Sequence, residues 1–110
     1  MISGPYGTGA RSDMERAENL RLLNRVALEV FRRGHVPIVG VNLALPLVEL
    51  GGSETYDEVM LPLSLAVAER CDAVLRVGGD SIGADQEVAR IAARGGAVFR
   101  TIEELPAAGG

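Results

Sequence analysis

The hydrophobic positions of this chain recur with two different spacings, which divide it into helices and strands. Between Ser12 and Gly34 the apolar residues return every three or four positions, as in a helix with one buried face. Ser12 and Glu15 form a capping box at its start, and Gly34 ends it. The same spacing predicts helices over residues 55–70 and 84–94.

Short, continuous apolar runs lie between these helices and predict buried strands over residues 2–3, 36–41, 73–77 and 97–100. Residues 42–53 are irregular, with a short helix expected around 45–50, and 102–105 form a short turn. A second capping box, Thr55–Glu58, opens the helix over 55–70. Pro62 either kinks that helix or begins a second piece of it.

Strands that alternate with helices predict right-handed βαβ units and a parallel sheet covered on both faces. We therefore expect an α/β fold with a mostly parallel sheet of four to five strands. Residues 1–106 form one domain in this interpretation, and residues 107–110 form a flexible tail. In such sheets, ligands bind beyond the carboxyl ends of the strands.

Two glycine-rich loops, Gly4–Gly9 and Gly78–Gly83, follow predicted strands and should line one crevice at that edge. The helix that starts after the second loop directs free N–H groups at whatever lies above it, and Glu87 falls close to its first turn. This combination predicts a ligand that carries a phosphate or a sugar, with an acid beside it. The residues expected to bind it are Gly4, Pro5, Tyr6, Gly7, Arg11, Asn42, Ser81 and Gly83.

The chemistry that fits these loops is retaining glycosyl transfer, in which a carboxylate attacks the anomeric carbon and an acid protonates the leaving group. Glu87 is the candidate nucleophile, and Asp80 is a second catalytic candidate. Arg11 or Arg16 would supply positive charge for a phosphate held by Ser81 and the N–H groups near Gly83. A purely structural interpretation of Glu87 stays open, because acids in a helix's first turns complement its dipole.

Composition narrows the class of partner. The chain has 110 residues, a formal charge of −4, 4% aromatic residues and no Trp, which disfavours a nucleic-acid polymer as ligand. Cys71 and His35 are single, so a disulfide, a thiolate-rich metal site and a Ser-His-Asp triad are not predicted. No apolar run approaches the length of about 18 residues that a membrane span needs, and no signal peptide is recognisable. We expect a cytoplasmic protein that does not contact membranes.

Three motifs occur in a characteristic order: Ile2-Ser3-Gly4-Pro5, then Cys71-Asp72-Ala73-Val74, then Ser81 and Gly83-Ala84 followed by Glu87. Together they resemble the nucleoside 2-deoxyribosyltransferase-like superfamily, which includes deoxynucleoside 5′-monophosphate N-glycosidases. The resemblance covers nearly the whole chain. It implies a flavodoxin-like or Rossmann-like three-layer sandwich, a homodimer or higher homo-oligomer, no metal or organic cofactor, and a covalent glycosyl–glutamate on Glu87.

Two positions depart from that pattern. Ser64 stands where hydrolases of the group carry an Asp, and Met1 stands where members often carry a Tyr that orients the glutamate. Asp80, Asp57 or Tyr6 would have to replace these groups. Alternatively, the chain is a nucleotide-binding or sensing module without turnover.

A flavin-binding protein is a third and weaker interpretation, because few aromatic residues are present to flank the ring. Hydrolysis and transfer differ only in whether water or a second base reaches the intermediate, so the sequence does not separate them.

Overall fold

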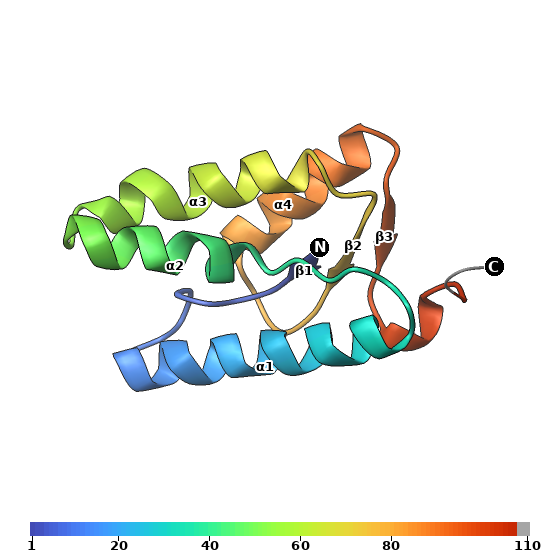
Figure 1. Cartoon of the computed structure of the whole chain (residues 1–110), viewed down its shortest axis with the longest axis horizontal. Helices are drawn as coiled ribbons and strands as arrows, with labels where there is room; N and C mark the ends of the chain where they lie inside the picture. Colours follow the sequence, from blue (N-terminus) through green and yellow to red (C-terminus); the bar gives the residue numbers. More distant parts are fainter. Residues whose placement is uncertain (108–110) are drawn as a thin grey trace.

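The computed structural model describes residues 1–107, which form a parallel sheet of three strands with four α-helices around it (Figure 1). The strands are β1 (Ile2–Ser3), β2 (Ala73–Arg76) and β3 (Ala97–Phe99), and they lie side by side in that order. In the register, Ser3 lies opposite Arg76. The predicted α/β class with a parallel sheet is thus confirmed. Except for Ala107, the predicted tail lies outside the described residues.

The prediction of a strand over residues 36–41 is wrong, and the sheet of the described residues has three strands rather than four or five. Only a parallel bridge between Ile2 and Val39 forms there, with the Ile2 N–H donating to the Ile38 carbonyl at 2.8 Å. Pro37 has no N–H to add to a ladder, and the next helix begins at Gly40. Too few residues are left for a full strand.

The helices are α1 (Asp13–Arg32), α2 (Gly40–Gly51), α3 (Thr55–Ala68) and α4 (Ile82–Ala93), followed by the 3₁₀ turn η1 (Ile102–Glu104). At the start of α1, the Ser12 hydroxyl accepts from the Glu15 N–H, as predicted. The second capping box is wrong: α3 follows Glu54, which is already helical and makes no side-chain cap bond.

Helices cover both faces of the sheet: α1 packs on one face, whereas α3 and α4 lie on the other side (Figure 1). One core contains Val74 and Ile91 from β2 and α4, and a second contains Leu75 and Leu23 from β2 and α1. This alternation along β2 turns every second side chain toward α4.

By the same alternation, Ser3 of β1 and Arg76 of β2 face α4, at the carboxyl ends of their strands.

Within residues 1–107, no helix is both long and apolar enough to cross a membrane.

Candidate active site

A cavity of about 1030 Å³ opens at the carboxyl edge of the sheet, between the first glycine loop and the helices α2, α3 and α4. One wall consists of apolar side chains from α2 and α3: Val41, Leu45, Val48, Met60 and Leu61. The rest of the cavity lining consists of hydroxyl groups, glycine backbone and charged side chains. Such a mixture suits a ligand with one apolar ring and several polar atoms.

Glu87 lines this cavity from the second turn of α4 and is only 8% exposed. Its Oε1 lies 2.5 Å from the Ser3 Oγ at the end of β1. Burial raises the pKa of Glu87 above its ordinary value, and the hydrogen bond from Ser3 and the nearby Ser64 hydroxyl partly oppose this rise. A buried carboxyl with perturbed titration in a cavity is a typical feature of a functional site.

The second carboxylate oxygen of Glu87 faces the start of α2. A Cβ added to Gly40 would lie 3.4 Å from Glu87 Oε2 and 2.7 Å from the Cβ of Ser64. Gly40 therefore lets α2 approach α3 and α4 closely around this carboxyl. Ser64 is 6% exposed, and its hydroxyl donates to the Leu61 carbonyl at 3.2 Å.

The two glycine loops pack against each other at the edge of the sheet. A Cβ on Gly4 would lie 2.7 Å from the Val77 carbonyl oxygen, so no larger residue fits there. Gly78 has φ +78°, and a Cβ on it would lie 2.8 Å from Pro5 Cδ. Glycine is needed at both positions because a Cβ would clash with the other loop. Gly78 is needed also because its backbone is left-handed.

Arg76 holds the second glycine loop in place through hydrogen bonds, and its side chain is almost fully buried. Its guanidinium donates to the carbonyls of Val77 at 2.5 Å and Gly79 at 2.8 Å, and to Asp85 Oδ1 at 3.1 Å. These bonds connect the end of β2, the loop and the first turn of α4. Since Glu87 is on that helix, Arg76 helps to fix the position of the glutamate.

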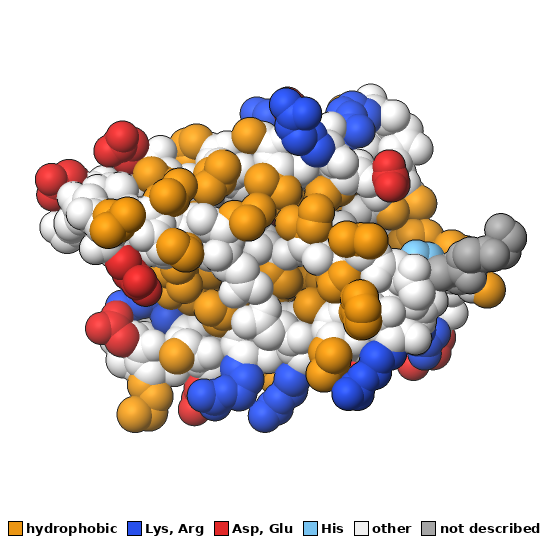
Figure 2. Space-filling view, in the orientation of Figure 1, with side chains coloured by type: hydrophobic (Ala, Val, Ile, Leu, Met, Phe, Trp, Pro, Cys, Tyr) orange, Lys and Arg blue, Asp and Glu red, His pale blue; other side chains and the backbone are white. Residues whose placement is uncertain are grey.

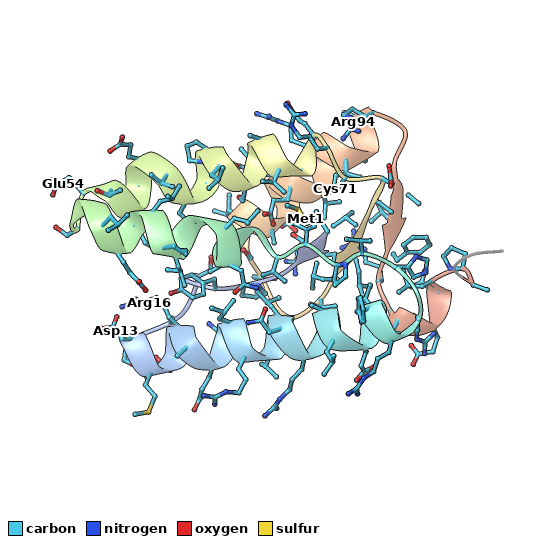
Figure 3. All side chains as sticks on the ribbon, in the orientation of Figure 1. Met1, Asp13, Arg16, Glu54, Cys71 and Arg94 are labelled. Carbon is cyan, nitrogen blue, oxygen red and sulfur yellow. The ribbon has the colours of Figure 1, made fainter. Side chains whose placement is uncertain are left out.

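The other end of the cavity is formed by Tyr6, Tyr56 and Arg16. Burial raises the pKa of both tyrosines, and the nearby Arg16 guanidinium opposes the rise. Arg16 forms an ion pair with Asp13, and both lie at the start of α1 (Figure 3). The Tyr56 hydroxyl lies 2.8 Å from where a Cβ on Gly7 would be, so the first loop reaches α3 here.

Six of the predicted site residues line the cavity together. They are Glu87 as candidate nucleophile and Gly4, Tyr6, Gly7, Ser81 and Gly83 as candidate ligand contacts. Ser81 has a structural role as well: its hydroxyl accepts from the Ala84 N–H at 3.2 Å and caps α4.

Four other candidates lie elsewhere. Pro5 and Asp80 line a separate hollow of about 360 Å³, so Asp80 is not beside Glu87. Arg11 and Asn42 line neither space; Asn42 is exposed, and its amide donates to Asn24 Oδ1 at 2.6 Å. The positions of these four residues depend on the course of the glycine loops and of α2, which the sequence patterns did not predict.

Sequence reasoning missed Ser3, Arg76 and Tyr56 as parts of the site. Ser3 and Arg76 are polar residues in the last positions of buried strands, where an apolar residue is usual. These polar residues at the ends of buried strands were the feature of the sequence that could have indicated the site. Gly40 gave none, because its role depends on contact with α3 and α4.

Comparisons with protein-family models, with curated proteins and with solved structures yield no match to this chain. Within residues 1–107, no group of three or more His, Cys, Asp or Glu side chains is arranged to hold a metal ion. Any function must therefore be inferred from the site itself.

Proposed function

We propose that this protein cleaves or transfers the N-glycosidic bond of a nucleoside or a nucleoside 5′-monophosphate, through a covalent glycosyl–Glu87 intermediate. The observation that carries the proposal is the Glu87 carboxyl, buried in the wall of a large cavity and held by a hydroxyl from β1. The three motifs that resemble nucleoside 2-deoxyribosyltransferase-like proteins agree with it. We regard the fold as a reduced flavodoxin-like three-layer sandwich, with the Val39 bridge in place of a fourth strand.

In the proposed reaction, a Glu87 oxygen attacks C1′ of the sugar while the bond from C1′ to the base nitrogen breaks. The bonding electrons leave with the base, which takes up a proton. Water or a second base then attacks C1′ and releases Glu87 as a carboxylate. The polar surface near Ser81 and Gly83 would hold the sugar or its phosphate, and the apolar wall of α2 and α3 would hold the base.

Two of the candidate proton donors, Tyr6 and Asp57, line the cavity with Glu87, whereas Asp80 does not. Asp57 is in the first turn of α3 and is exposed. We propose that one of these two groups, or water, protonates the leaving base. Ser64, which lies against Glu87, has no acidic proton for this task.

The test is incubation with a mixed pool of nucleosides and 5′-monophosphates, with release of free bases followed by chromatography. Replacement of Glu87 by Gln should lower the rate by at least a factor of about 10³, as expected for loss of a covalent nucleophile. A matched control is Glu103→Gln, an exposed acid in η1 away from the cavity. In the parent protein, a mass increase of one pentosyl group on the peptide with Glu87 would identify the intermediate.

The second candidate is a nucleotide-binding or sensing domain without turnover. It is favoured by Ser64, which puts a hydroxyl beside Glu87 where hydrolases of the superfamily that the motifs resemble carry an Asp. Calorimetry with the same pool separates the two. Tight binding without release of any base over hours would support the sensing domain, and a Glu87→Gln variant as fast as its parent would exclude Glu87 as nucleophile.

A further inference from the structure

Ser3 is among the most buried side chains of the molecule, at 1% exposure. Its Oγ lies 2.5 Å from Glu87 Oε1 and 3.2 Å from the carbonyl oxygen of Ala84. Both partners belong to α4, one turn apart. A single hydroxyl on β1 thus contacts the backbone of α4 and the carboxyl that projects from it.

The hydroxyl of Ser3 has one hydrogen, and the Ala84 carbonyl can only accept. When Glu87 is ionised, that hydrogen is donated to Oε1. When Oε1 is protonated, it donates to Ser3, whose own hydrogen is then free to turn toward the Ala84 carbonyl. Rotation about the Cβ–Oγ bond therefore satisfies the buried carboxyl in both charge states.

We infer that Ser3 is the positioning residue of the Glu87 carboxyl: it holds Oε1 in either charge state and leaves Oε2 as the attacking oxygen. Oε2, which Ser3 does not hold, points toward the start of α2, where a Cβ on Gly40 would lie 3.4 Å from it. In this way Ser3 takes over the orienting role for which no tyrosine stands at Met1. The assignment of Oε2 rests on the proposed function, whereas the hold on Oε1 does not.

The attack on C1′ converts Glu87 from an anion into a neutral group. The Ser3 hydroxyl can hydrogen-bond the side chain in both forms. Oε2 forms a bond to C1′, the bond from C1′ to the base breaks, and its electrons leave with the base. Glu87 becomes a neutral ester in which Oε1 is the carbonyl oxygen. Ser3 can still donate to that oxygen, so the carboxyl keeps its position throughout the reaction.

Other groups around Glu87 remain when Ser3 is changed. The Ser64 hydroxyl of α3, the amino group of Met1 and the Arg76 guanidinium of β2 all favour the ionised carboxyl, whereas burial opposes it. Because these influences are constant, the effect of the Ser3 hydroxyl can be isolated.

The test uses Ser3→Ala, which removes the hydroxyl, and Ser3→Cys, which keeps a weaker donor of similar shape. Ser12→Ala is the matched control, since Ser12 caps α1 and does not line the cavity. Two quantities are measured for each protein: the pH dependence of kcat/KM, and the midpoint of the Glu87 signal in a carboxyl-carbon NMR titration. The Glu87 signal is identified by its absence from Glu87→Gln.

In Ser3→Ala, the acidic limb of the profile and the NMR midpoint should both move up by about one pH unit or more, since the ionised carboxylate loses a stronger hydrogen bond than the neutral acid does. The rate above that limb should fall about tenfold, because the attacking oxygen is no longer fixed. Ser3→Cys should lie between Ser3→Ala and the parent, and Ser12→Ala should change neither quantity.

An unchanged NMR midpoint in Ser3→Ala would overturn the inference, and so would an unchanged midpoint in Ser3→Cys if the alanine variant does not fold. This readout needs no activity. If the parent releases no base but the midpoint moves in the variants, the proposed function fails while the hold of Ser3 on Glu87 stands. If the parent is active and the midpoint does not move, only the inference fails.

Discussion

At the scale of single residues, the site is dominated by one carboxyl that is kept from water. Removing an ionised carboxylate from water is unfavourable, so burial raises the pKa of Glu87, and two serine hydroxyls recover part of that cost. A nucleophile must be ionised, which means that the activity should increase as the pH rises through this pKa.

The same pKa shift predicts how stability depends on pH. Folded protein retains a proton on Glu87 at pH values where the unfolded chain has lost it, so the free energy of unfolding falls as the pH rises through this window. The slope from one group reaches at most about 1.4 kcal/mol per pH unit. Glu87→Gln lacks this titration, and we expect it to gain stability relative to the parent as the pH rises.

Thermal unfolding of the parent and of Glu87→Gln between pH 4 and about pH 8 measures this difference. The melting temperatures should diverge in favour of the variant toward higher pH. Parallel curves over the whole range would mean that the folded protein does not perturb this carboxyl.

At the scale of elements, the site depends on how closely the starts of α2 and α4 approach α3. Gly40 and Gly83 are both in the first turn of a helix, without a left-handed backbone, but they have different neighbours. A Cβ on Gly40 would meet Ser64 Cβ at 2.7 Å, whereas a Cβ on Gly83 would meet only Leu61 Cδ1 at 3.6 Å. The first distance is a clash, and the second is ordinary contact.

The pair of variants Gly40→Ala and Gly83→Ala tests this difference. Gly40→Ala should lower the free energy of unfolding by about 1–3 kcal/mol, because α2 must move away from Ser64. Gly83→Ala should be neutral or stabilising by up to about 1 kcal/mol, since alanine is the better helix former. Denaturant midpoints measure both, and equal stability of the two variants would contradict the close approach of α2.

At the scale of the whole molecule, apolar side chains remain uncovered on the helices beside the cavity. Leu43, Leu47 and Leu50 of α2 are 49%, 48% and 87% exposed, and their spacing places them along one side of the helix. Figure 2 shows hydrophobic side chains gathered over α2 and α3. Helix α2 has Glu49 as its single charged residue, which keeps this surface apolar.

We propose that a second copy of the chain covers this surface, in line with the homo-oligomer expected from the sequence. Leu47→Glu should then convert the oligomer to a monomer, because it would bury an unpaired charge in the interface. Leu22→Glu is the matched control: Leu22 is 57% exposed on α1, on the opposite side of the sheet. Light scattering after size-exclusion chromatography measures the mass, and a monomeric parent would contradict the proposal.

Local signals in the sequence were sufficient to predict the helices α1 and α4, the three strands and the parallel sheet. Apolar spacing, the Ser12 cap and the glycine turns each act over only a few residues, so they can be recognised without the fold. They also led to Glu87, since a glycine loop and a helix start identify a position near the edge of a sheet. They failed for residues 36–41, where a short extended segment gave way to α2.

Only the tertiary structure decided which polar groups meet at the site. Ser3 and Glu87 are 84 positions apart in sequence, and their contact exists because β1 lies beneath α4. The positions of Asp80 and Asn42 outside the cavity were settled in the same way, by the course of a loop and of a helix. Local spacing determines which way a side chain points from its own element, but the packing of elements determines what it meets.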